Sequence, residues 1–410
     1  MQEWRCSLPL KNNRSGKYRY LIYLLFSGIM ALNQIIRFIP SVSFPVVLVY
    51  RISFMVLFIV MITGLFGLTK LKFVDMLFLL CGTYILLINL INGVGMVDSL
   101  VSICWPFAFI FGEKMADSQC YNRFKKIRLI IYFLIVAAST YAMYVNFTGV
   151  PTAKTNIIGV NYIIYYGLPL LLAPYSKHST NKKSSRYSTV ALFMLWIGLA
   201  IFSFKRTTLI AVVGGVLIYL YKKYFANKKM KNKFLFLLIL LVLVAVAMVV
   251  NNYTNGYIIE RLNDVQETGG NGRVEIWSLV INLYSKSSFV EKLFGNGGLD
   301  AVNAMIGVSA HNEFLEILYD YGIFGVFFVG IALTALLLEL FSKKVRKSNY
   351  APLVWTTLVI LCVLAMFSHI FLYPFVSIPV FFFLGNLYSA CKGISETADT
   401  LYKIYSDDVF

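Results

Sequence analysis

The sequence predicts an all-α polytopic membrane protein with about twelve transmembrane helices and one long loop outside the membrane. The chain is 59% hydrophobic and 14% charged, with a mean hydropathy of +0.73, so lipid must solvate most of its 410 residues. Outside short basic connectors, its polar residues gather in one segment, residues 251–312. We therefore expect a single transmembrane domain over residues 1–410, with 251–312 as its catalytic loop.

Apolar stretches of about 17–25 residues, long enough to cross a bilayer as helices, recur along the chain. The predicted spans are 20–36, 46–68, 73–91, 97–112, 129–147, 157–174, 189–204, 207–221, 234–250, 313–341, 351–368 and 375–391. The span 97–112 is short, and 207–221 follows its predecessor after only Lys205 and Arg206. A re-entrant or strongly tilted pair is the alternative there.

The basic connectors predict the orientation. Most of the 37 lysines and arginines lie in the cytoplasm if both termini are inside and 251–312 is outside. Connectors of this kind also account for the formal net charge of +18, since they are typical topology signals and contacts with anionic headgroups. Membrane lipids are therefore expected partners, and nucleic acid is not.

The external segment has room for two short helices. Its stretch RVEIWSLVINLYSK (273–286) places Ile276, Val280 and Leu283 on one face, which predicts a helix lying in the membrane interface. Glycine-rich turn signals surround it, including the run from Gly295 to Gly298.

His311 lies at the beginning of the predicted span 313–341. An interfacial histidine near a helix end is the simpler interpretation. However, the positive end of a helix dipole disfavours imidazolium, and a neutral histidine facing an aqueous loop can accept a proton. It is the only histidine of the loop, which makes it the candidate general base.

Two arginines are candidate phosphate ligands. Arg206, with its neighbour Lys205, lies at an outside turn between two apolar stretches, where it either snorkels to the interface or grips a phosphate with its planar fork. Arg273 has Trp277 one helical turn away, so the two share a face. That pair either anchors an interfacial helix or supplies a second cation with an aromatic platform.

Arg261 is a further outside cation, and Arg51 is expected to face the bundle interior because it lies slightly inside a span. Asp98, Glu313 and Asp320 are isolated acids with no predicted role. No carboxylates lie at metal-binding spacing, and no phosphate-binding glycine loop is present, so no metal and no cofactor are expected.

The run HNEFLEILYDYGIFG resembles the signature of the O-antigen ligase and Wzy-type O-antigen polymerase family. In that signature a histidine is followed by Asn, Ser or Gln, then nine residues, a glycine, two residues and a second glycine. His311, Asn312, Gly322 and Gly325 occupy those positions.

Further segments support the resemblance. RVEIW and the later LFGNGG (293–298) are similar to the segment that these proteins carry upstream of the histidine. SFKRT resembles the family's arginine at a helix start, although Lys205 stands where serine is frequent. The motifs cover roughly residues 200–330, and the architecture covers the whole chain.

The resemblance implies a metal-independent glycosyltransferase with a GT-C-like bundle in the bacterial plasma (inner) membrane. Its substrates would be undecaprenyl-diphosphate-linked oligosaccharides, and a flippase and a chain-length regulator are candidate partners. In this interpretation His311 activates the acceptor hydroxyl. Arg206 and Arg273 hold the diphosphate, and Lys205, Arg261, Arg51, Trp277 and Asn312 complete the substrate-binding set.

Three functions remain open from the sequence. We favour a polymerase that transfers the glycan chain to a lipid-linked repeat unit, making O-antigen, capsule or exopolysaccharide. A ligase would transfer it to lipid A core or another acceptor. A flippase for the same lipids is the third, although we find neither an internal repeat nor the midplane charges typical of transporters.

Overall fold

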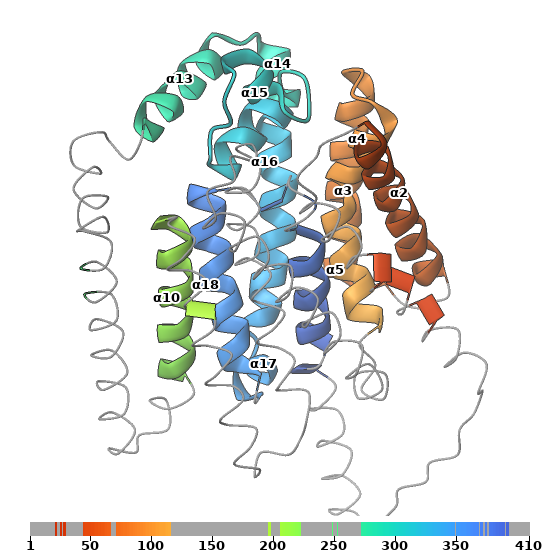
Figure 1. Cartoon of the computed structure of the whole chain (residues 1–410), viewed down its shortest axis with the longest axis vertical. Helices are drawn as coiled ribbons and strands as arrows, with labels where there is room; N and C mark the ends of the chain where they lie inside the picture. Colours follow the sequence, from red (N-terminus) through yellow and green to blue (C-terminus); the bar gives the residue numbers. More distant parts are fainter. Residues whose placement is uncertain are drawn as a thin grey trace, which may run out of the picture.

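The computed structural model describes residues 44–66, 71–115, 206–222, 272–348, 350–368 and 377–389, with a few isolated residues besides. Over this part of the chain every regular element is a helix and none is a strand, in agreement with the all-α prediction (Figure 1). The helices are α2 (Phe44–Phe66), α3 (Phe73–Ile91), α4 (Met96–Ser102), α5 (Cys104–Met115), α10 (Arg206–Leu220), α13 (Arg273–Lys286), α14 (Phe289–Phe294), α15 (Ala301–Ile306), α16 (Glu313–Leu340), α17 (Lys343–Lys347) and α18 (Ala351–Phe367), together with a helix over Ser377–Ser389.

Among the described residues, α3 and α16 are long and apolar enough to cross a membrane. The pair α4–α5 is bent by 49° and forms a third span if it is one crossing. Shorter apolar helices lie within the predicted spans 46–68, 207–221, 351–368 and 375–391. The chain is therefore an integral membrane protein. The count of about twelve spans stays a prediction, because 129–147 and 157–174 lie outside the described residues, as do most of 20–36, 189–204 and 234–250.

Helix packing in the core depends on close backbone approach. A Cβ atom on Gly112 of α5 would lie 2.1 Å from the carbonyl oxygen of Phe382, and one on Gly385 would lie 2.2 Å from that of Phe109. Since lipid tails are as apolar as leucine, helices in a bilayer associate through such small residues and tight packing. Buried aromatic rings then fill the space around this crossing, with Phe78 and Phe109 stacked at 4.6 Å.

The helix α16 is broken at Gly322, although the sequence predicts one continuous span over 313–341. Gly322 has φ 69° and ψ −170°, which only glycine adopts readily. The break frees three carbonyl groups, and each finds another donor. Tyr319 O accepts from the Asn296 amide at 2.9 Å, Asp320 O from the Gly298 amide at 3.0 Å, and Tyr321 O from the Tyr84 hydroxyl at 2.7 Å. These bonds satisfy the rule that backbone polar groups within a membrane must be paired.

The turn Gly295–Gly298 fits directly into this break. A Cβ atom on Gly295 would lie 2.1 Å from Asp320 O, and one on Gly322 would lie 2.4 Å from Leu293 O. The loop is also held from α3, since Asn89 Oδ1 accepts from the Leu299 amide at 2.9 Å. The predicted turn at 295–298 is therefore confirmed, and it is where the loop packs against α16.

The helix predicted over 273–286 is confirmed as α13, and its place in the membrane interface stays a prediction. Ile276, Val280 and Leu283 pack against a small core that contains Val302 and Tyr319. The loop thus folds onto α16, where α13, α14 and α15 gather at one end of the bundle (Figure 1).

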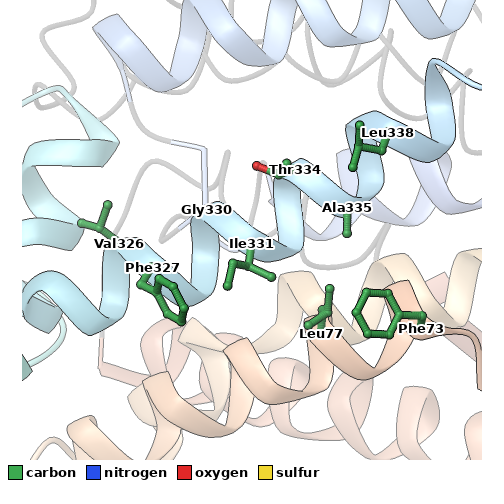
Figure 2. Close-up of a pocket in the computed structure, with 9 residues that line it drawn as sticks. All are labelled: Phe73, Leu77, Val326, Phe327, Gly330, Ile331, Thr334, Ala335 and Leu338. Atoms are coloured by element: carbon green, nitrogen blue, oxygen red, sulfur yellow. The ribbon is translucent and has the colours of Figure 1, made fainter.

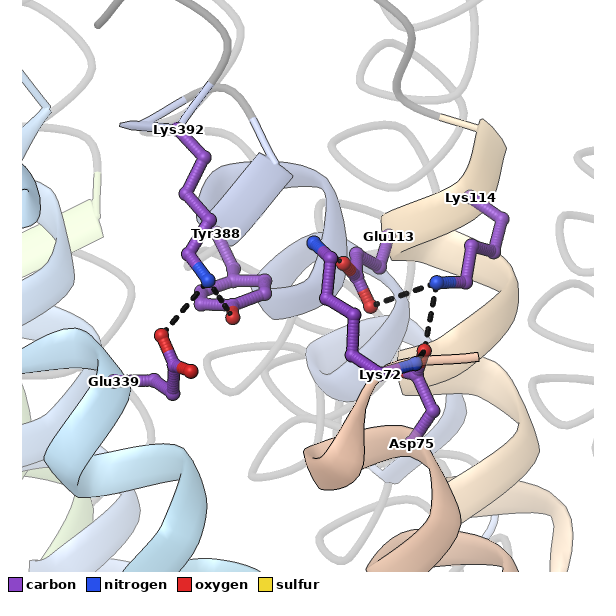
Figure 3. Close-up of polar contacts among 7 residues, drawn as sticks. All are labelled: Lys72, Asp75, Glu113, Lys114, Glu339, Tyr388 and Lys392. Atoms are coloured by element: carbon purple, nitrogen blue, oxygen red, sulfur yellow. Dashed lines mark hydrogen bonds and ion pairs between the residues drawn. The ribbon is translucent and has the colours of Figure 1, made fainter. Parts of the chain in front are cut away.

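The other end of α16 lies beside α3 and α17. An open apolar groove runs between α3 and the second half of α16 (Figure 2). Beyond it, ion pairs connect the helix ends (Figure 3). The partners are Lys72 with Glu113, Lys114 with Asp75 and Glu113, and Lys392 with Glu339.

Candidate active site

His311 lies where the chain turns out of the loop and into α16. Its backbone is left-handed, with φ 53°, which is uncommon for a residue with a side chain. Ala310 before it is fully buried, and Asn312 after it caps α16. The imidazole itself is half-buried. A turn that is fixed on both sides therefore determines where this side chain lies.

Asn312 belongs to that turn. Its Oδ1 atom accepts from the amides of Phe314 and Leu315 at 3.1 and 3.2 Å, as the N-cap of α16. The resemblance implies a substrate-binding role for Asn312, but its side-chain oxygen is engaged in capping. The cap orients the first turn of α16 and, with it, the neighbouring His311.

The His311 turn is also held by α13. The Nε1 atom of Trp277 donates to the carbonyl oxygen of Ala310 at 2.8 Å, and its ring lies 6.2 Å from that of Phe367 at the end of α18. Trp277 therefore braces three elements at the turn. Its predicted role as a platform for substrate stays a prediction.

One helical turn earlier on α13, Arg273 reaches the beginning of α10. Its Nη1 and Nη2 atoms each lie 3.4 Å from Oγ1 of the buried Thr207. Thr207 follows Arg206, the first residue of α10. The structure thus brings Arg273 to the helix start that carries Arg206, of which it describes only the backbone.

The remaining predicted cations do not extend this site within the described residues. Arg51 is not directed into the bundle interior as expected. Its side chain is half exposed and forms an ion pair with Asp98 at 3.3 Å, which connects α2 to α4. Lys205 and Arg261 lie outside the described residues.

A group of buried acids follows His311 on α16, where the sequence showed only the isolated acids Glu313 and Asp320. Glu313, Glu316 and Asp320 are all buried, and their spacing places them on one face of α16. Glu313 accepts from the amides of Ile370 and Phe371, the second at 3.0 Å, and Asp320 Oδ1 accepts from the Val302 amide at 3.0 Å. The sequence shows the helical spacing of these three acids, but it does not show which backbone amides donate hydrogen bonds to them.

The connection from α13 to α14 is stabilised by short-range hydrogen bonds. Tyr284 donates its hydroxyl to the carbonyl of Lys292 at 2.9 Å, and burial raises the pKa of this phenol. Ser288 and Glu291 form a capping box on α14. The bonds from the Ser288 amide and hydroxyl lower the pKa of the Glu291 carboxyl, so the box is complete at neutral pH.

Taken together, α13 connects two chemical groups that lie far apart in the sequence. Its first turn holds Arg273 at the beginning of α10, and its second turn holds Trp277 against the residue before His311. A cation that can bind phosphate and an imidazole that can accept a proton are thereby fixed to the same short helix. This arrangement suits transfer of a group from a phosphate leaving group to a hydroxyl.

Comparison with known proteins agrees with this arrangement. Residues 190–330 match a family model described as O-antigen ligase. The search of curated proteins gives no match. The matched region contains Arg206, Arg273 and His311, and also Gly295 and Gly322, which join the loop to α16. Residues 190–330 of this integral membrane protein are therefore similar to the O-antigen ligase family.

Proposed function

We propose that the protein is a polysaccharide polymerase of the bacterial plasma membrane, with both termini in the cytoplasm. It transfers a glycan chain from undecaprenyl diphosphate to a lipid-linked repeat unit at the outer face. The family match supports the coarser function, a membrane enzyme of polysaccharide assembly that acts on lipid-linked oligosaccharides. A flippase would deliver these substrates, and a chain-length regulator would limit their growth.

The observation that carries the proposal is the position of α13 between Thr207 and Ala310. Arg273 and Trp277 are four residues apart, so their side chains lie on one face about one turn apart. A donor diphosphate at Arg273 would therefore lie close to an acceptor hydroxyl at His311. Holding two substrates in this way removes much of the entropic barrier to their reaction.

In the proposed step, the acceptor hydroxyl loses its proton to the imidazole of His311. The hydroxyl oxygen forms a bond to the anomeric carbon while the bond from that carbon to the diphosphate oxygen breaks. Undecaprenyl diphosphate leaves with the bonding electrons, and Arg206 and Arg273 stabilise its developing charge. The proton on His311 passes to water. This route requires no metal, because the two arginines supply the positive charge.

A ligase is the second candidate, because the matching family model carries that description. A ligase would use the same base and the same cations. It would differ in its acceptor, which would be lipid A core or another final anchor. The two functions are therefore distinguished by product and not by the arrangement of α13.

The test is a glycan ladder from cells that lack the gene, with the wild type or a variant restored. For a polymerase, the deletion reduces the ladder to single repeat units that still reach their final anchor. For a ligase, long chains persist and accumulate on the lipid carrier. Accumulation of unextended repeat units on the cytoplasmic leaflet would show a transporter and refute the proposal.

The variant His311→Ala locates the chemistry, and His178→Ala is its matched control, since His178 lies outside the loop and the matched domain. We expect His311→Ala to remove at least about 100-fold of the activity at an unchanged level in the membrane, the size of effect typical of a general base. The His178→Ala protein should rescue the ladder fully. Full rescue by His311→Ala would refute the base assignment.

A further inference from the structure

The groove between α3 and α16 lies beyond the break at Gly322, on the side away from His311. It is lined almost entirely by apolar side chains (Figure 2), which are Phe73 and Leu77 of α3 and Val326, Phe327, Gly330, Ile331, Thr334, Ala335 and Leu338 of α16. Three of them are largely exposed: Phe73 is 72% exposed, Phe327 54% and Leu338 69%. The groove is thus an open surface on two helices that are apolar enough to cross a membrane.

The length of the groove matches one leaflet. From Val326 to Leu338 the helix rises about 18 Å, at 1.5 Å per residue. Half of a hydrocarbon core of about 30 Å is about 15 Å. One extended acyl chain from a single leaflet would therefore lie along the groove, with its headgroup near the end of α16.

After the groove end of α16, the chain forms a strongly basic helix, α17. Four of the five residues of α17 are cations, namely Lys343, Lys344, Arg346 and Lys347, and all four are exposed. Val345 is buried in the core and fixes α17 in place. Among the residues that the structure describes, no carboxylate forms an ion pair with any of the four.

The neighbouring charges do not compete for these cations. Glu339, the carboxylate nearest in sequence to α17, pairs with Lys392 at 2.8 Å, while Lys72 and Lys114 pair with Glu113 and Asp75 (Figure 3). The ion pairs at the helix ends therefore cancel one another. Among the described residues at this end of α16, the cations of α17 are the charges without an ion pair, and an anionic headgroup is their complement.

We propose that the groove and α17 together bind one anionic phospholipid of the adjacent leaflet. Its acyl chain lies between α3 and α16, and its headgroup phosphate contacts the basic side chains of α17. The site is separate from the proposed catalytic site, because about 20 Å of helix lies between Glu313 and Val326. The proposal does not depend on the glycan chemistry proposed above.

The experiment measures lipid binding to the purified full-length protein in detergent by native mass spectrometry. The probes are dioleoyl phosphatidylglycerol, dioleoyl phosphatidylcholine with the same chains, and glycerol 3-phosphate without chains. We expect phosphatidylglycerol to bind with one tight site, at least about tenfold tighter than phosphatidylcholine, because cations near a membrane surface each contribute measurably to anionic lipid binding. Glycerol 3-phosphate should neither bind at that strength nor displace the lipid. Equal binding of the two lipids would overturn the proposal, as would tight binding of glycerol 3-phosphate, which would show a free phosphate site.

Two variants with matched controls distinguish the contribution of the headgroup to lipid binding from that of the acyl chain. Lys343→Gln with Lys347→Gln should weaken phosphatidylglycerol about tenfold or more, whereas Lys286→Gln with Lys292→Gln, at the loop end, should leave it unchanged. Gly330→Leu should fill part of the groove and weaken phosphatidylglycerol binding, and its Cβ atom has room because no atom lies within 4 Å of that position. Gly28→Leu is the control, since its added Cβ also meets no atom.

Thr334→Leu provides a second groove variant if Gly330→Leu is poorly folded, since Thr334 is exposed and lines the groove. Phosphatidylglycerol binding could be lost when the groove is filled but kept when the two lysines are removed. That result would indicate that the groove binds an uncharged acyl chain or the tail of the lipid carrier, without a headgroup contact at α17. Unchanged binding in both the groove and the lysine variants would place the phospholipid elsewhere. Either result contradicts the proposed site.

Discussion

The two ends of α16 hold their charged groups in different ways. At the loop end, three charged side chains form hydrogen bonds with neutral groups. Arg273 lies against the hydroxyl of Thr207, and the buried acids Glu313 and Asp320 accept from backbone amides. These hydrogen bonds fix the direction of each side chain, and a site that stabilises developing charge needs such preorganised groups.

At the α17 end, Lys72, Lys114 and Lys392 are matched with carboxylates, whereas the cations of α17 itself form no ion pair among the described residues. The matched groups are called the α17-end charges below. Lys114 lies 2.6 Å from the fully buried Asp75, and Tyr388 lies between the ammonium groups of Lys72 and Lys392, at 5.1 and 4.5 Å from its ring centre. Charges that cancel in pairs act as connections between helix ends. If the proposed chemistry takes place at the loop end, variants there should change activity, and variants of the paired charges at the other end should change stability.

The largest effect is expected where the loop enters α16. In Gly322→Ala the new Cβ would meet the backbone of Leu293 and Gly295, in a conformation that alanine rarely adopts. Because backbone cannot move away as a flexible side chain can, we expect a loss of about 4 kcal/mol or more and little protein in the membrane. The measurement is the amount of protein that is monodisperse after extraction in detergent. Gly330→Ala is the control, and equal yields of the two variants would contradict the described fit.

The next effect concerns the matched charges. Lys114→Met removes one partner of Asp75, which is fully buried, and should cost about 3–4 kcal/mol because an uncompensated charge remains. Thermal unfolding in detergent measures the loss. If α17-end charges only assemble the bundle, the glycan-extending activity per folded molecule should stay at the wild-type level. A normal melting temperature with reduced activity would reverse the assignment of the two ends.

At the loop end the pattern should be the opposite. Arg273→Lys keeps the positive charge but loses the planar fork that binds phosphate in two places, so we expect activity to fall about 10- to 100-fold. The melting temperature should change little, since the two contacts of Arg273 with Thr207 Oγ1 are long, at 3.4 Å. The same substitution at Arg51, whose partner Asp98 is exposed, should leave activity unchanged. Activity retained in Arg273→Lys would exclude bidentate phosphate binding there.

Much of this fold could be predicted from the apolar pattern, because lipid requires continuous helices of a given length. The bounds of α3, α13 and α16 agree with that pattern to within a residue. The break at Gly322 could not be predicted, since it depends on the loop residues Gly295 and Asn296, which contact it only after folding. Local periodicity contains no information about such contacts.

The candidate site could also be predicted from the sequence only in part. The place of His311 before a helix follows from the sequence, and its neighbours Ala310 and Trp277 follow only from the fold. The approach of Arg273 to the start of α10 also depends on long-range packing. The expectation that Arg206 and Arg273 act together came from the family resemblance, because their spacing in the sequence does not predict it.

The smallest effect tests whether Asn312 belongs to the fold or to the chemistry. Asn312→Ala removes the cap of α16 and should cost about 1 kcal/mol, measured by thermal unfolding. Asn312→Asp keeps an acceptor at the same place, and aspartate caps a helix as well as asparagine does. If Asn312 only orients His311, Asn312→Asp should restore both stability and glycan extension. If stability returns and activity does not, the lost amide N–H group contacts substrate, because the cap uses only the oxygen that the two residues share.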